Sequence, residues 1–132
     1  MPKTVLKPAS LSFFPSPDYP YSPGTKAGRL VYTAGQVAFN ERKELVGLGD
    51  VGAQTRQTLK NVLAILAEGG AGPDDVLKCN VYLSDMRYFA AMNAEFQAVF
   101  GDKTPPARTT VEARLAEPEM LVEIEAIACI DE

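Results

Sequence analysis

Histidine is absent from the sequence, and this absence excludes several classes of active site. Without an imidazole group the chain has no Ser-His-Asp or Cys-His nucleophile system, no histidine general base, and no His-ligated zinc or two-His iron site. Cysteine is nearly absent as well, since Cys79 and Cys129 are the only two and are too far apart in the sequence to form a Cys-x-x-Cys motif. Chemistry must therefore come from carboxylates, arginine, lysine, hydroxyls, a thiol or the backbone.

The chain also lacks an excess of positive charge and any long hydrophobic run. Lys and Arg number 13 against 17 Asp and Glu, a net charge of −4, so nucleic acid and anionic membrane surfaces are poor candidate partners. No segment approaches the ~18 consecutive apolar residues of a membrane span, and early prolines leave no hydrophobic region for a signal peptide. We therefore expect a cytoplasmic protein with reduced thiols.

What the sequence does contain is enough for one hydrophobic core, because 46% of its 132 residues are hydrophobic. We expect a single domain over residues 1–132, in which residues 1–19 form a proline-rich N-terminal arm. Prolines and aromatics alternate in and just after this arm, a pattern typical of an extended, packed segment. Its aromatic side chains either line a pocket or only hold a loop in place; they are Phe13, Phe14, Tyr19 and Tyr21.

Hydrophobic periodicity predicts an α+β fold. The expected helices span 51–68 and 86–100, and the expected strands span 29–39, 75–83, 107–115 and 120–130. Gly35 interrupts the first of these strands, which indicates a bulge or a close backbone approach. In the second strand, Leu77, Cys79, Val81 and Leu83 alternate onto one face. Two helices can cover only one face of such a sheet, so the other face is either wet or buried against another subunit.

Glu123 and Glu125 share one face of the last expected strand with mainly apolar residues. A carboxylate in this position suits neither a dry core nor bulk water, whereas subunit association would accommodate it. Such a carboxylate can orient or deprotonate a water. The alternative is a structural ion pair to Arg108, Arg114 or Lys78.

Arg108 follows Pro105-Pro106-Ala107, a rigid lead-in to the expected strand at 107–115. A guanidinium held in this way binds a planar carboxylate through two parallel hydrogen bonds, which suits a small organic acid. The alternative is an ordinary surface arginine or one paired with Glu123 or Glu125. Both cysteines, in contrast, have the sequence surroundings of small buried hydrophobes.

Several segments resemble one family in both their order and their spacing. They are Pro20-Tyr21-Ser22, Val31-Tyr32-Thr33-Ala34-Gly35-Gln36, Phe89-Ala90-Ala91-Met92-Asn93, Pro106-Ala107-Arg108-Thr109-Thr110 and Val122-Glu123-Ile124-Glu125-Ala126. On these motifs the sequence is identified as a member of the Rid family, the YjgF-type reactive intermediate deaminases. The resemblance implies a chorismate-mutase-like α+β fold, with a mixed sheet and two helices on one face. It further implies a homotrimeric barrel with its sites in clefts between subunits.

The resemblance also implies roles for individual residues. Arg108 matches the arginine that binds the substrate carboxylate, and Glu123 matches the carboxylate that positions the hydrolytic water. The positions that line the same cleft are Tyr21, Ala34, Gly35, Asn93 and Thr110. Ala34 stands where the best-known branch of the family commonly has serine, and Thr110 stands where cysteine is frequent, so we expect an altered pocket wall and substrate range.

The implied activity is hydrolysis of reactive 2-aminoacrylate-type 2-imino acids to 2-ketoacids and ammonia, with no metal and no cofactor. This is a hydrolase acting on C=N bonds, of the 2-iminobutanoate/2-iminopropanoate deaminase type. Two alternatives stay open: a regulatory trimer that binds a small carboxylate without turnover, and an aminoacrylate deaminase of pyrimidine breakdown. The chaperone and RNA-cleaving roles sometimes attached to the family have little support in an acidic chain without histidine.

Overall fold

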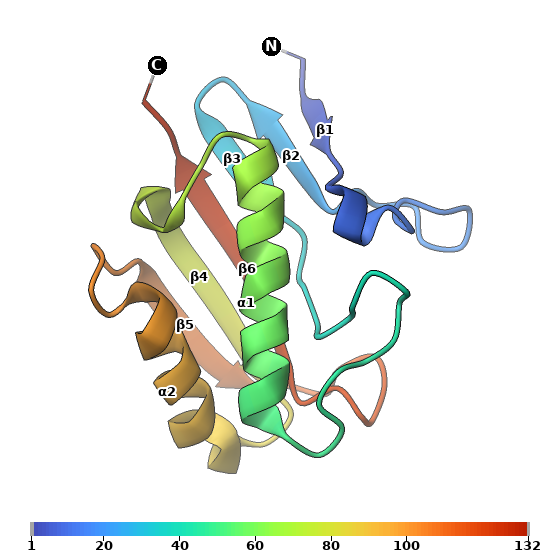
Figure 1. The fold of residues 1–132 in the computed structure, drawn as a ribbon, viewed down its shortest axis with the longest axis vertical. Helices are drawn as coiled ribbons and strands as arrows, with labels where there is room; N and C mark the ends of the chain where they lie inside the picture. The colour runs from blue at the N-terminus through green and yellow to red at the C-terminus, as the bar shows by residue number, and fades with distance from the viewer. Residues whose placement is uncertain (1, 132) are drawn as a thin grey trace.

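The computed structural model describes residues 2–131, which form a mixed six-stranded sheet with α1 and α2 on one face (Figure 1). The strands are β1 (Thr4–Leu6), β2 (Gly24–Ala27), β3 (Leu30–Thr33), β4 (Val76–Leu83), β5 (Ala107–Glu112) and β6 (Val122–Cys129), and the helices are α1 (Val51–Glu68) and α2 (Phe89–Phe100). Short 3-10 turns cover Ala9–Leu11, Pro73–Asp75 and Met86–Tyr88. The order across the sheet is β1-β2-β3-β6-β4-β5, and only β4 and β5 run parallel. The expected α+β architecture with two helices on one face is confirmed.

Helix α1 has the bounds that the sequence predicts. The Asp50 side chain accepts a hydrogen bond of 3.0 Å from the backbone N–H of Ala53, which caps the first turn. At the other end, Gly70 adopts a φ of 85°, a conformation that glycine allows without strain. The second helix begins later than expected, because a 3-10 turn capped by Asp85 occupies Met86–Tyr88.

The N-terminal third contains more strand than the sequence predicts. β1 lies inside the proline-rich arm, and β2 lies at the end of the region read as an extended loop. The strand expected at 29–39 ends at Thr33. Tyr32 pairs with Ile127 and Gln36 pairs with Ile124, so four residues on this segment oppose three on β6 and the register shifts by one residue. This bulge places Gly35 beside β6, in agreement with the expected irregularity.

The hydrophobic core lies between the sheet and the two helices. Cys79, Val81 and Leu83 are fully buried there, as expected. Leu77 is not, since a register shift between Val76 and Lys78 turns it outward and leaves it 54% exposed, with Val76 buried in its place. The expectation that Leu77 shares the buried face is therefore wrong.

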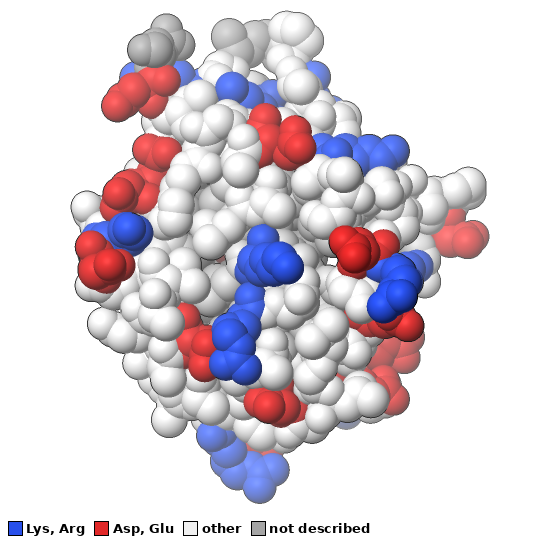
Figure 2. Space-filling view, viewed as in Figure 1, with Lys and Arg blue, Asp and Glu red and all other residues white. Residues whose placement is uncertain are grey.

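The face of the sheet opposite the helices, called the open face below, has neither α1 nor α2 packed against it (Figure 1). Tyr32 and Tyr82 project from this face, and Glu123 and Glu125 lie on it as well. On the helical face, some Lys and Arg side chains form a short column at the centre, and others lie in separate patches around the rim, several of them next to Asp or Glu (Figure 2). Within residues 2–131 no helix is long and apolar enough to span a bilayer.

Candidate functional site

Glu123 lies at the start of β6 on the open face and is half-buried against Gly35. A Cβ added at position 35 would lie 2.9 Å from Glu123 Cδ, so a larger residue there would displace this carboxylate from its present position. Gly35 therefore combines the bulge and the close approach that its place in the sequence indicates. Tyr21 lines the same cavity, and its pKa is raised by burial and then by the charge of Glu123. We call Glu123, Gly35 and Tyr21 the glutamate half-site.

The carboxyl group of Glu123 has a raised pKa, first because of burial and then because of the nearby charge of Glu125. Glu125 itself accepts hydrogen bonds from Tyr82 Oη at 3.0 Å and Asn80 Nδ2 at 3.4 Å. Among the ion pairs of residues 2–131, none involves Glu123 or Glu125. The alternative expectation of an ion pair from these carboxylates to Arg108, Arg114 or Lys78 is therefore wrong.

Glu123→Gln is expected to make the protein more stable at neutral pH. The pKa of Glu123 in the folded protein lies above its ordinary value of 4.5, so ionisation of this group disfavours the folded state. The stability of the wild type therefore falls as the pH rises from the ordinary pKa to the raised pKa of the folded protein. The neutral amide does not ionise, so the variant should have the higher melting temperature above the interval. Thermal melts of both proteins from pH 4 to pH 8 measure the difference in their melting temperatures. A difference that does not become smaller toward acid pH would contradict the prediction.

Arg108 lies on β5 on the opposite side of the sheet, beneath α2. Its Nη1 donates a hydrogen bond of 2.8 Å to Asn93 Oδ1, and its Cζ is 4.7 Å from the ring centroid of Phe96 and 5.4 Å from that of Phe89. These aromatic contacts fix the planar guanidinium without neutralising its charge. No carboxylate of residues 2–131 forms an ion pair with it, so Arg108 is neither freely exposed nor paired.

Thr110 follows two residues later on the same face of β5. Its Oγ1 is buried and has no hydrogen-bond partner among the described residues. Leaving a buried hydroxyl unpaired costs about 1–3 kcal/mol. We call Arg108, Asn93 and Thr110 the arginine half-site.

The two half-sites face opposite sides of the sheet. Arg108 pairs in register with Cys79, which is buried under the helices, whereas Glu123 pairs with Tyr82 on the open face. Paired residues in neighbouring strands point to the same side. One chain therefore assembles each half-site but does not bring Arg108 and Glu123 together. Ala34 lies beside the glutamate half-site, where it lines a separate shallow hollow with Tyr21.

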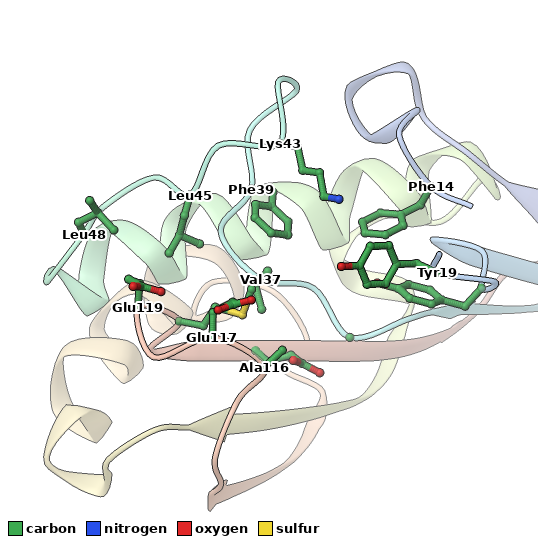
Figure 3. A pocket seen from close by; sticks show the side chains of 14 residues that line it. Phe14, Tyr19, Val37, Phe39, Lys43, Leu45, Leu48, Ala116, Glu117 and Glu119 are labelled. Carbon is green, nitrogen blue, oxygen red and sulfur yellow. The ribbon is translucent and has the colours of Figure 1, made fainter. Parts of the chain in front are cut away.

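An elongated cavity of about 460 Å³ opens beside Glu123 and continues between two loops (Figure 3). Its lining residues are Phe14, Tyr19, Tyr21, Gly35, Val37, Phe39, Lys43, Leu45, Leu48, Ala116, Glu117, Glu119, Met120 and Glu123. Of the two readings of the aromatic arm, the pocket wall is confirmed for Phe14, Tyr19 and Tyr21. Phe13 instead packs against the core.

Two buried amide side chains on α1 hold the cavity walls. Gln54 Nε2 donates to the carbonyl oxygens of Gly47 and Glu119, and its Oε1 accepts from Leu121 N–H at 2.9 Å. Asn61 Nδ2 donates to the carbonyl oxygens of Val37 and Phe39. The signal for both was present in the sequence, since each is a polar residue on the buried side of an amphipathic helix.

Cys79 is an inert part of the core. Burial raises the pKa of its thiol to about 12, so the nucleophilic thiolate is negligible at neutral pH. The expectation of a small buried hydrophobe is confirmed for this residue, while Cys129 is only half-buried.

Comparisons with known proteins agree on one family. The family model described as endoribonuclease L-PSP matches residues 14–130. A RutC family protein of Pyrococcus horikoshii is 43% identical over 86% of this chain and 90% of its own length. The 3-aminoacrylate deaminase RutC of Acinetobacter baylyi is 34% identical over 97% of this chain and 98% of its own length. Among solved structures, the Rid family protein YyfA of Yersinia pestis superposes with a TM-score of 0.87 at 32% identity, covering 98% of this chain and 100% of that one. Escherichia coli TdcF with bound serine has a TM-score of 0.80 at 30% identity, over 97% and 96%.

Proposed function

The chain belongs to the endoribonuclease L-PSP family, which includes RutC and Rid proteins, and from this premise we propose that it is a hydrolase acting on C=N bonds. Its proposed substrates are 2-imino acids of the 2-aminoacrylate type, and its products are 2-ketoacids and ammonia. The 3-aminoacrylate deaminase among its relatives supports deamination of a small unsaturated amino acid. The serine bound to TdcF supports a site that accepts an amino-acid carboxylate.

The observation that carries the proposal is that Arg108 and Glu123 are both held in place and both lack an ion-pair partner within residues 2–131. Structural ion pairs neutralise such charges, whereas binding and catalytic groups keep them available. Arg108 offers parallel N–H donors for the substrate carboxylate, and Glu123 offers a carboxylate of raised pKa that is suited to proton transfer.

The proposed reaction uses these two groups and one water. Arg108 binds the substrate carboxylate and so positions the C=N carbon, which is electrophilic once the nitrogen is protonated. Glu123 orients the water and takes its proton as the oxygen bonds to this carbon, giving a carbinolamine. Glu123 then returns this proton to nitrogen, and the C–N bond breaks so that ammonia leaves. As the carbonyl forms, the hydroxyl group loses its proton to Glu123, which balances the proton that the imine nitrogen took up at the start. The sum is one imine and one water converted to one ketoacid and one ammonia.

Completion of the site requires a second copy of the chain, because the two half-sites face opposite sides of the sheet. We propose a homotrimer in which the arginine half-site of one subunit meets the glutamate half-site of its neighbour. The open face, with its tyrosines and without a helix packed on it, supports burial against other subunits. We also propose that the enzyme works in the cytoplasm, which its two unpaired cysteines favour.

RNA cleavage, which the family description names, is less well supported in this chain. The net charge is −4, and the basic side chains of the helical face are divided into separate patches, several of them next to acidic side chains (Figure 2). Binding to a phosphate backbone relies on an extended positive surface.

The decisive assay follows ammonia and ketoacid release from imines that an amino-acid oxidase generates in situ. The protein is expected to accelerate release from the imine of alanine above the spontaneous rate. 3-Aminoacrylate belongs in the same panel, because hydrolysis of this enamine acid also yields ammonia and a carbonyl product. Absence of acceleration with every substrate would overturn the proposal and favour a trimer that binds small carboxylates without turnover.

A further inference from the structure

The elongated cavity extends well beyond the space that a three-carbon substrate needs. Phe14 and Tyr19 lie toward one end and Leu45 and Leu48 toward the other (Figure 3), and Glu123 and Gly35 also line the cavity. Its volume of about 460 Å³ falls in the range of about 300–1,000 Å³ that is typical of pockets for larger small molecules. A substrate whose reacting carbon lies at Glu123 would therefore direct its side chain along this cavity.

The walls of the cavity are mainly apolar and aromatic. Phe14 stacks on Tyr21 with ring centroids 5.0 Å apart, and Phe39 and Val37 line the adjacent wall. Leu48 is 70% exposed, so apolar surface here is left in contact with water. Covering such surface with an apolar group is favourable by about 25 cal/mol per Å². The lining therefore favours a large apolar side chain.

The charges around the cavity disfavour an acidic side chain. The carboxylates of Glu117, Glu119 and Glu123 oppose a single cation, Lys43. Lys43 is itself engaged, since its Nζ is 4.8 Å from the ring centroid of Tyr19 and 5.4 Å from that of Phe14. A second carboxylate on the substrate would meet net negative charge.

The walls are also fixed before a substrate arrives. Gln54 and Asn61 hold the two loops to α1 through the hydrogen bonds described above. The turn that carries Lys43 is closed by bonds from Lys43 N–H to the Asn40 carbonyl and from Glu44 N–H to Asn40 Oδ1. A cavity held in this way binds without first ordering its walls.

From these observations we infer that the cavity is the side-chain subsite and that it selects 2-imino acids with large apolar or aromatic side chains over three-carbon and dicarboxylic ones. The inference rests on the proposed deaminase function and assigns its substrate class. The residues that determine this selection are Phe39, Leu45, Leu48 and Ala116, which line the cavity together with Glu123.

The test compares kcat/KM for the imines of phenylalanine, leucine, alanine and glutamate, each generated by an amino-acid oxidase. The wild type is expected to prefer the phenylalanine and leucine imines over the alanine imine by about tenfold or more. Leu45→Trp and Ala116→Trp fill the cavity from opposite walls, and each should lower the phenylalanine-to-alanine ratio by about tenfold or more. Lys60→Trp, on the exposed side of α1 and outside the cavity, is the matched control and should keep the wild-type ratio.

The outcomes separate this inference from the function on which it rests. Acceleration that favours the alanine or glutamate imine, or a ratio unchanged in both filled variants, would overturn the subsite while the deaminase function stands. Absence of acceleration with every imine would overturn the deaminase function itself. Because a ratio of two substrates does not depend on the fraction of folded protein, partial misfolding of one variant does not obscure the result.

Discussion

Arg108→Ala is expected to lower kcat/KM for every imine by about 100-fold or more, because the substrate carboxylate loses its charged, bidentate partner. Asn93 remains, but an amide supplies neither the charge nor the fork of a guanidinium. Arg108→Lys should recover only part of the activity, since an ammonium binds as a point charge. The measurement is ammonia and ketoacid release from oxidase-generated imines.

Arg114→Ala is the control for this experiment. Arg114 follows β5, is exposed, and lies outside both half-sites, so its removal should leave turnover close to the wild-type value. Size-exclusion chromatography of the Arg108 variants checks that assembly persists. Wild-type turnover in a correctly assembled Arg108→Ala protein would exclude the carboxylate-binding role of this residue.

The parts of the fold that were predictable from the sequence are those encoded by local pattern. Helix α1 has a capping Asp50, an amphipathic period and a terminal glycine pair, and its bounds are as predicted. β1 and β2 were not identified, because short strands among prolines carry too little alternation and form only through pairing with β3. The outward turn of Leu77 depends on a bulge, which shifts the period without changing the composition.

The candidate site divides in the same way. Arg108 and Glu123 were identified from their motifs, and Gly35 was marked by its position inside a strand pattern. The sequence suggested a pocket at the aromatic arm, but not the wall formed by residues 37–48, because the segment between β3 and α1 has no regular structure to reveal its side-chain directions. Its course is set by long-range hydrogen bonds from Gln54 and Asn61. The sequence does not determine the strand register, and it is this register that places Arg108 and Glu123 on opposite sides of the sheet.

Because Arg108 and Glu123 lie on opposite sides of the sheet, we expect two inactive variants to regain activity when they assemble together. Arg108→Ala and Glu123→Gln are each expected to be inactive alone. When they are co-expressed and assemble together, a site between subunits can take Arg108 from one variant and Glu123 from the other. In a random equimolar mixture about a quarter of the sites between subunits regain both groups, so about a quarter of wild-type activity should return.

The matched control is assembly of either single variant with the double variant Arg108→Ala/Glu123→Gln. No site in those mixtures contains both groups, so no activity should return. Differently tagged chains and tandem purification confirm that mixed assemblies have formed. If confirmed mixed assemblies of the two single variants stay inactive, Arg108 and Glu123 do not act in one site between subunits. If activity returns only in the first mixture, the carboxylate of one chain acts on a substrate bound by the arginine of another.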